Sequence, residues 1–227
     1  MKMTTGSAIL DQLLEGGYET DIITTIYGPA GAGKTCICML AGSEVARTGK
    51  KVIFVDTENG FSVERLKQVA PDYEKVLEQM VFLRPTRFKD QAEAIFKLNT
   101  LVNDKIGLIV VDTIGMLYRI EMGQAKEVYE INSSLGKQIS LLSEIARTKN
   151  IPVLVTNQVY ADFDKKDAVK IVGGDILKYG SKCMIEIKAA HSNVRQLILR
   201  KHRSIAQEKS CMFQIVQTGI SEIDHVL

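Results

Sequence analysis

The segment 28–35, GPAGAGKT, restricts the folds open to this chain more than any other stretch. It matches the pattern Gly-x-x-x-x-Gly-Lys-Ser/Thr at every fixed position. The β-branched run at residues 21–27 predicts a strand before it, and residues 35–48 predict a helix that stops at Gly49. In this arrangement glycines let successive N–H groups curl around a phosphate, and the helix N-terminus adds partial positive charge. The segment therefore predicts a site for nucleotide phosphates rather than an ordinary glycine-rich turn.

The side chains of this loop have separate expected roles. We expect Lys34 to reach the terminal phosphates and the Thr35 hydroxyl to hold Mg²⁺. The predicted nucleotide-binding residues of the segment are Gly28, Pro29, Ala30, Gly31, Ala32, Gly33, Lys34, Thr35 and Cys36.

Short apolar runs alternate with helical patterns through the middle of the chain. Runs at residues 52–56, 81–83, 107–112 and 152–156 predict buried strands of a parallel sheet that helices cover on both faces. Residues 4–17 predict a short helix capped by Thr or Ser. Two longer helices carry apolar stripes that we expect in the core, with Phe88, Ala92, Ile95, Phe96 and Val102 on one and Val128, Ile131, Leu135, Ile139, Leu142 and Ile145 on the other.

The pattern changes after Gly180. Residues 182–188, 194–201 and 210–216 predict three antiparallel strands, the first two joined by a turn at 191–193. The predicted fold class is therefore α/β, a parallel sheet flanked by helices with a C-terminal antiparallel extension. Without a linker or repeat, residues 1–227 are expected to form a single domain.

Composition limits the kinds of partner. The net charge of +2 gives no strong overall attraction to nucleic acid, so such contacts must come from a local patch. The four cysteines are expected as small core residues in a reducing compartment rather than as a disulfide or zinc set. Without a bilayer-spanning run or a signal-peptide core, we expect a cytoplasmic protein with no membrane contact.

Polar residues at three strand ends are the further candidates for chemistry. Asp112 ends an apolar strand, where a carboxylate beside the loop could anchor Mg²⁺ through water or could instead cap a helix. Glu58 follows a strand that we expect next to the loop strand; it could polarise the attacking water or cap the helix near Ser62. Gln158 could contact the γ-phosphate and report its loss to the following loop, or it could be an ordinary polar strand end.

Three segments are candidates for contacts with nucleic acid. Residues 116–122 form a predicted loop in which Tyr118 and Arg119 could stack on bases or pack on a partner. Residues 160–174 predict a mobile basic loop with Lys165, Lys166 and Lys170, although three aspartates make a solvated surface loop an equal alternative. The basic cluster Lys201, His202 and Arg203 could face phosphate or solvent.

Taken in order, these motifs resemble the ATPase core of the RecA/RadA recombinases. The resemblance rests on Thr5-Gly6, the phosphate loop, Asp56-Thr57-Glu58, residues 108–112, Thr156-Asn157-Gln158 and Gly173-Gly174, and it covers nearly the whole chain. It implies ATP and Mg²⁺ as cofactors, with Lys34, Glu58 and Gln158 as catalytic residues and Thr35 and Asp112 at the metal. It also implies that Arg65 packs on adenine and that residues 116–122 and 160–174 are DNA-binding loops.

Within this family the chain most resembles the short archaeal RadB branch, which consists of the core alone. That resemblance implies an accessory protein of recombination that binds DNA, with single-stranded DNA as the expected form. It also implies protein partners such as a RadA-type recombinase or a Holliday-junction resolvase. Recombinases with an N-terminal helical domain carry a docking segment that is not expected here. We therefore expect weak DNA-dependent ATPase, little or no strand exchange, and a homodimer rather than a long filament.

Two alternatives belong to other classes. One is a KaiC-like regulatory ATPase that acts on proteins and not on DNA, because the opening at residues 5–11 occurs in both groups. The end at Asn157-Gln158 and the exit at Gly173-Gly174 favour the recombinases. The other is an interaction protein with a vestigial nucleotide site.

Overall fold

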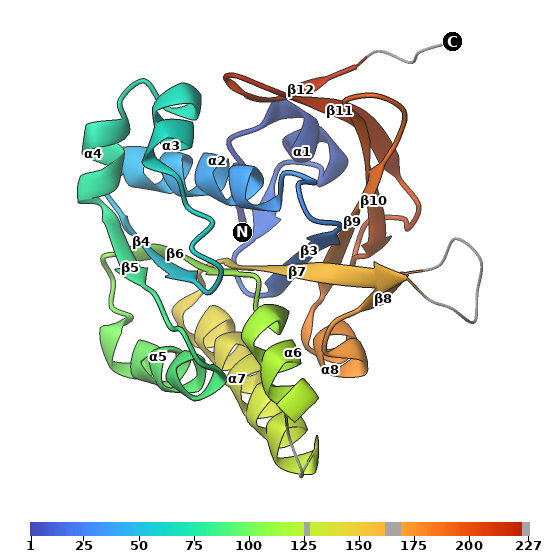
Figure 1. The fold of residues 1–227 in the computed structure, drawn as a ribbon. Coiled ribbons are helices and arrows are strands. Elements are labelled where there is room, and N and C mark those ends of the chain that lie inside the picture. Colours follow the sequence, from blue (N-terminus) through green and yellow to red (C-terminus); the bar gives the residue numbers. More distant parts are fainter. Residues whose placement is uncertain (125–127, 162–168, 224–227) are drawn as a thin grey trace.

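A computed structural model describes residues 1–124, 128–161 and 169–223. Within these residues a ten-stranded sheet forms the centre of the molecule, in the order β12-β11-β10-β9-β3-β7-β6-β4-β5, with β8 beside β7 (Figure 1). Its parallel part consists of β3 (Ile23–Gly28), β4 (Lys51–Asp56), β5 (Met80–Leu83), β6 (Ile106–Asp112), β7 (Val153–Ala161) and β9 (Cys183–Ala189). The predicted parallel α/β core is confirmed.

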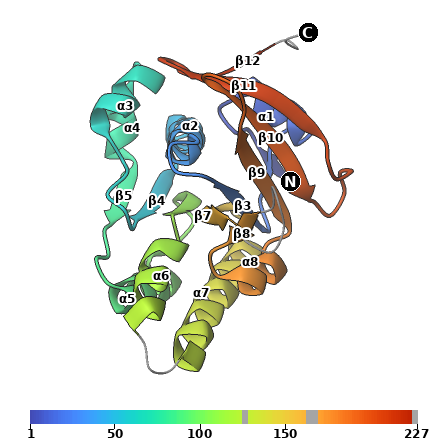
Figure 2. The ribbon, with the colours of Figure 1, turned by 45° about the vertical axis from the view of Figure 1, so that its right-hand side comes forward.

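Helices cover both faces of this sheet (Figures 1 and 2). One face carries α1 (Ala8–Leu13), α2 (Lys34–Arg47), α3 (Val63–Val69) and α4 (Tyr73–Glu78), and the other carries α5 (Phe88–Leu101), α6 (Gly115–Gln124), α7 (Val128–Lys149) and α8 (Gly174–Gly180). Alternate residues of β4 divide between the two cores: Phe54 packs on the α2 side and Val55 on the α5 side. This division explains why the strands are apolar throughout.

The C-terminal antiparallel extension is also confirmed. Strand β9 runs parallel to β3 and antiparallel to β10 (Val194–Lys201), which pairs in turn with β11 (Ser210–Val216). Strand β12 (Gly219–Glu222) completes the extension and was not predicted. Near the N-terminus, β1 (Lys2–Met3) and β2 (Tyr18–Glu19) form a separate antiparallel pair.

The strand order corrects one expectation. Strand β4 was expected next to the loop strand β3, but β7 and β6 lie between them. In doubly wound α/β sheets a helix connects each strand to the next parallel strand by a crossover. Strands that are consecutive in the sequence therefore need not be neighbours in the sheet. The strand that leads to Glu58 is consequently separated from the loop strand by two others.

Two predicted loops are wrong in part. Residues 116–122 lie in α6, because Leu117 and Tyr118 pack into the core shared with α5 and α7. In the segment 160–174, β7 continues through Ala161 and β8 (Val169–Ile171) returns antiparallel to it, followed by the unpredicted helix α8. Lys165 and Lys166 lie outside the described residues.

Three further expectations about packing differ from the structure. Phe96 and Val128, which were placed in the core, are 43% and 45% exposed; Val128 is the first residue of α7. The first helix is shorter than predicted, and its N-cap Ser7 makes no side-chain cap bond; the Ser7 N–H instead donates to the Thr5 hydroxyl.

No helix of the described residues is long and apolar enough to cross a bilayer.

Cysteines occupy the interior as small side chains. Cys36, Cys38 and Cys183 are buried and Cys211 is half-buried, all with free thiols. Burial raises the pKa of Cys183 to about 12 and that of Cys211 to about 11, so these thiols stay protonated at neutral pH.

Candidate nucleotide-binding site

The phosphate loop connects β3 to α2, and its glycines are required by its backbone. Gly31 and Gly33 have φ angles of +72° and +99°, in the left-handed region that other residues rarely adopt. At Gly28 a Cβ would lie 2.5 Å from the carbonyl oxygen of Ile187 in β9. Another residue would therefore strain the backbone at Gly31 and Gly33 or clash with β9 at Gly28, and the loop ends on the N-terminus of a 14-residue helix.

Lys34 is the buried cation of the site. Its Nζ donates to the carbonyl oxygens of Gly28 at 3.0 Å and Pro29 at 2.8 Å. Burial lowers the pKa of Lys34, and the carboxylates of Asp112 and Glu58 act in the opposite direction. The ammonium group therefore lies inside the loop with negative groups facing it.

Thr35 and Asp112 form the polar pair that suits a divalent cation. The Thr35 hydroxyl donates to Asp112 Oδ2 at 2.6 Å, and the Thr156 hydroxyl donates to Asp112 Oδ1 at 2.5 Å. Burial raises the pKa of Asp112, an effect that these two hydrogen bonds oppose. Within the described residues no group of three or more His, Cys, Asp or Glu side chains could hold a metal. One hydroxyl and one carboxylate fit Mg²⁺, which keeps waters and takes its remaining ligands from phosphates.

Glu58 lies across from this pair, on the turn that follows β4. The turn is closed by Asp56, whose carboxylate accepts the N–H groups of Gly60 at 3.0 Å and Phe61 at 3.1 Å. Glu58 Oε2 accepts the Thr113 hydroxyl at 3.1 Å, and Oε1 accepts Gln158 Nε2 at 2.5 Å. Burial raises the pKa of Glu58, although the Thr113 hydrogen bond opposes this.

The helix-capping role that was the alternative for Glu58 belongs to another residue. The Ser62 hydroxyl accepts the N–H of Arg65 at 3.2 Å and caps α3. The Glu58 carboxylate is therefore available to Thr113, which follows β6, and to Gln158 in β7.

Gln158 lies within β7 rather than at its end, because the strand continues to Ala161. Its neighbour Asn157 is buried and donates to the Val172 carbonyl at 2.6 Å. The amide that contacts Glu58 is thus one residue from the amide that holds the chain beyond β8.

Arg65 joins the start of α2 to the far end of the chain. Its guanidinium donates to the carbonyl oxygens of Val216 at 2.8 Å, Gln217 at 3.0 Å and Gly219 at 3.2 Å, and it lies 3.3 Å from Cys36 Sγ. The guanidinium therefore stands between the first turn of α2 and the β11–β12 turn.

Two of the candidate nucleic-acid segments, residues 116–122 and 160–174, contribute to one cavity. The hydroxyl of Tyr118 donates to Asn132 at 2.7 Å, and both Tyr118 and Arg119 line a cavity of about 850 Å³ beside Tyr160 and Gly173-Gly174. Lys170 lies in β8, on the described part of the second segment. The cavity thus brings together residues from both segments that were candidates for DNA contact.

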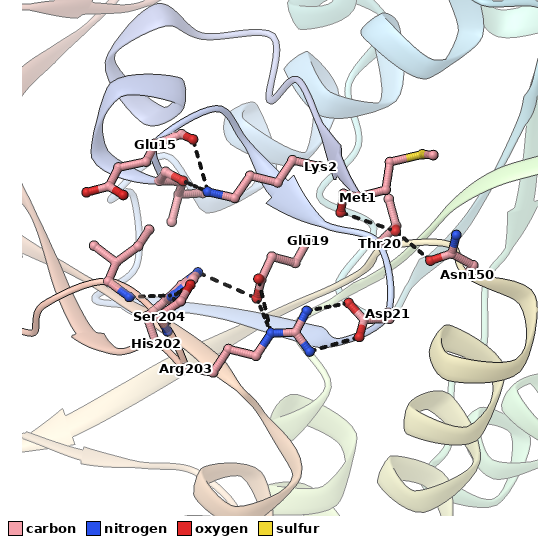
Figure 3. Close-up of polar contacts among 12 residues, drawn as sticks. Met1, Lys2, Glu15, Glu19, Thr20, Asp21, Asn150, His202, Arg203 and Ser204 are labelled. Carbon is pink, nitrogen blue, oxygen red and sulfur yellow. Dashed lines mark hydrogen bonds and ion pairs between the residues drawn. The ribbon is translucent and has the colours of Figure 1, made fainter.

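The basic cluster at the end of β10 makes its contacts inside the protein. Arg203 donates to both oxygens of Asp21 at 2.7 and 2.8 Å and to Glu19 at 3.0 Å (Figure 3). The His202 side chain is only 1% exposed, and Lys201 Nζ donates to the Lys178 carbonyl at 2.5 Å. These contacts connect the end of β10 to β2, to Asp21 and to α8.

Two contacts of the site were missed by sequence reasoning. Thr113 donates to Glu58 and has a φ of +66°. It directly follows the strand-end residue Asp112, and this position in the sequence could have marked it as a site residue. Arg195 donates to the Gly31 carbonyl at 3.2 Å across 164 residues, and no sequence pattern marks it.

Comparison with known proteins identifies the family. The family model described as Rad51 matches residues 1–223. The DNA repair and recombination protein RadB of Methanobrevibacter smithii is 40% identical and aligns over 96% of this chain and 95% of its own length. The RadB protein of Methanocaldococcus jannaschii is 39% identical, over 95% of this chain and all of its own length.

A solved structure agrees with these relatives. The crystal structure of the RadB recombinase superposes with a TM-score of 0.83 at 34% identity, covering 97% of this chain and 99% of the other. The regulatory-ATPase alternative is therefore not favoured. By family model, relatives and structure alike, the chain belongs to the RadB group of the Rad51/RecA family of DNA repair and recombination proteins.

Proposed function

We propose that this protein binds ATP with Mg²⁺ in the phosphate loop and that the nucleotide controls its affinity for DNA and for recombination partners. The observation that carries the proposal is the hydrogen bond between Glu58 and Gln158, 100 residues apart, beside Lys34 and the Thr35–Asp112 pair. A water-activating carboxylate and a phosphate-sensing amide would then share one contact. A displacement of the Gln158 amide would therefore also change the hydrogen bonding of the Glu58 carboxylate.

Each side chain has a defined part in this cycle. Lys34 binds the terminal phosphates, and Thr35 and Asp112 hold Mg²⁺, which offsets the phosphate charge. Glu58 accepts a proton from the attacking water, since burial has raised its pKa towards the range useful for a base. Gln158 donates to the γ-phosphate in place of Glu58, and Asn157 carries its displacement to Val172.

The finer features of the protein belong to the same proposal. ATP hydrolysis is slow and strand exchange is weak or missing. ATP therefore acts by switching the affinity for DNA and partners and not by driving strand exchange. Residues 1–227 act as one ATPase core in the cytoplasm, as a homodimer. Arg119 and Lys170 contact single-stranded DNA beside the cavity that Tyr118 lines, and protein partners are a RadA-type recombinase or a Holliday-junction resolvase.

The switch is tested with two variants and one control. Affinities for ATP and for single-stranded DNA are measured with and without ATP at two salt concentrations, because backbone binding must weaken as salt rises. We expect Lys34→Ala to lose ATP binding, and Gln158→Ala to bind ATP but to lose the effect of ATP on DNA affinity. The exposed Gln207→Ala should match the unchanged protein.

Hydrolysis is tested separately. Glu58→Gln should lower the turnover number by about 10²-fold or more at similar ATP affinity, as expected for loss of a general base. If ATP left DNA affinity unaltered in the unchanged protein, or if Gln158→Ala kept the full ATP effect, the switch would be refuted.

A further inference from the structure

The C-terminal strands shape the phosphate loop from outside. Ile187 of β9 lies against Gly28, where a Cβ would be 2.5 Å from its carbonyl oxygen. Ile215 of β11 lies against Gly33, where a Cβ would be 2.9 Å from Ile215 Cδ1. These two glycines are held by close packing against residues more than 150 positions later in the chain.

Gly31, at the tip of the loop, is different. It is exposed, its φ is +72°, and a Cβ built on it would meet nothing within 4 Å among the described residues. A glycine without steric neighbours has a wide choice of conformations. The contact from outside the loop that the structure shows is a hydrogen bond from Arg195 Nη2 to the Gly31 carbonyl at 3.2 Å.

Arg195 is itself fixed. Its Nη1 donates to the Asn193 backbone carbonyl at 2.9 Å and to Asn193 Oδ1 at 2.8 Å. Asn193 Nδ2 in turn donates to the Ile215 carbonyl at 3.3 Å, on the residue that packs against Gly33. The guanidinium therefore reaches the loop from a support built on the β9–β10 turn and β11.

The peptide that Arg195 contacts is held at both ends. The oxygen of the Gly31–Ala32 peptide accepts from Arg195, and its N–H, on Ala32, donates to the Pro29 carbonyl at 3.3 Å. Because a peptide group is planar, these two hydrogen bonds set its orientation. This peptide lies at the tip of the loop, so the two hydrogen bonds restrain the tip.

We propose that Arg195 is a positioning residue of the phosphate loop, which holds the Gly31–Ala32 peptide in its closed orientation before nucleotide arrives. The consequence for affinity rests on the proposed nucleotide binding, whereas the consequence for loop order does not. A loop that is already ordered binds phosphate without a further ordering cost. Arg195 acts through the loop, so ATP and ADP benefit alike.

The first test uses the protein without nucleotide. Amide hydrogen exchange is followed in peptides covering residues 29–33 and, as an internal reference, the interior of α2. In Arg195→Ala the loop amides should exchange roughly threefold to tenfold faster, the effect of one modest hydrogen bond, while α2 stays unchanged. Arg87→Ala is the matched control, because Arg87 pairs with Asp90 on the far helix α5.

Arg195→Lys separates geometry from charge. Lysine keeps the positive charge but has a single ammonium head, which cannot reproduce the fork between Gly31 and Asn193. We expect its loop amides to exchange as fast as those of Arg195→Ala. Full protection in the lysine variant would show that charge alone suffices and would overturn the positioning role, as would an unchanged loop in Arg195→Ala.

Binding supplies the second measurement. ATP and ADP affinities should both fall, by the same factor of about three to ten, in Arg195→Ala. A loss confined to ATP would mean a direct γ-phosphate contact and would contradict the inference. If the unchanged protein bound no nucleotide, the proposed function would fail, and the exchange data would still decide the role of Arg195.

Discussion

Replacement of Arg203 by alanine separates a structural role from a DNA-binding one. In the structure Arg203 connects the end of β10 to Glu19 and Asp21, so its loss should lower stability and leave DNA affinity unchanged (Figure 3). The Glu19 side chain is only 10% exposed, and without Arg203 the ring nitrogen that remains near it is His202 Nε2, 3.7 Å away, on an imidazole whose pKa burial lowers.

The size of the effect follows from these contacts. Removing one partner of a buried pair costs about 3–5 kcal/mol, and an exposed pair contributes about 0.2–1 kcal/mol. The Arg203 side chain is 43% exposed, so water can replace part of its contact with Glu19. We therefore expect the free energy of unfolding to fall by about 2 kcal/mol, which corresponds to a melting temperature lower by about 4–8 °C for a chain of this size.

Urea unfolding and calorimetry measure the stability, and titration of single-stranded DNA at several salt concentrations measures the affinity. A double-mutant cycle with Glu19→Gln isolates the pair, because the second replacement should cost much less once Arg203 is gone. An Arg203→Ala variant as stable as the unchanged protein would contradict the structural role of Arg203. A DNA affinity that falls, with a salt slope reduced by about one, would return Arg203 to the DNA surface.

Three other outcomes follow from the described contacts. Gly28→Ala should destabilise the protein far more than Gly31→Ala in urea unfolding, since the first meets a backbone carbonyl whereas the second adds only a left-handed φ costing about 1–2 kcal/mol; equal losses would contradict this. Burial lowers the pKa of His202 below its usual 6.5, and Nδ1 accepts the N–H groups of Ser204 and Ile205, so its contribution to stability is present above pH 6.5 and is lost as the pH falls through the lowered pKa. Unfolding free energies at pH 7.5 and 5.5 should show this loss, and His202→Asn, which keeps an acceptor that does not titrate, should reduce it. Since burial raises the pKa of Glu58, the acid limb of the turnover number should lie above the ordinary carboxyl pKa near 4.5 and should vanish in Glu58→Gln.

Much of the parallel core could be predicted because its signals are local. The loop GPAGAGKT and the apolar strands carry their own spacing, and the structure reproduces most of their bounds to within a residue or two. Strand order could not be read in the same way. Strand β4 follows α2 in sequence, yet the crossover carries it past β7 and β6, and no pattern within β4 records that distance.

Residues whose role depends on distant partners were the ones that composition alone described poorly. Arg203 belonged to a basic run, but its charge is matched by Glu19 and Asp21 from more than 180 positions earlier. The α6 region has a short, partly apolar sequence that predicted a loop. Its packing on α5 and α7 stabilises a helix there, and this packing could not be predicted from the local sequence. Sequence could name the strand-end residues of the site, whereas tertiary contacts determine which of them touch.

The guanidinium of Arg65 has one more consequence. A long side chain that is free in solution loses about 2 kcal/mol of rotational freedom when it is fixed. The three carbonyl groups of the β11–β12 turn have already immobilised Arg65 during folding. A purine that stacked on Arg65, as the family resemblance implies, would meet a rigid plane, so the entropy of association should carry no penalty from this arginine.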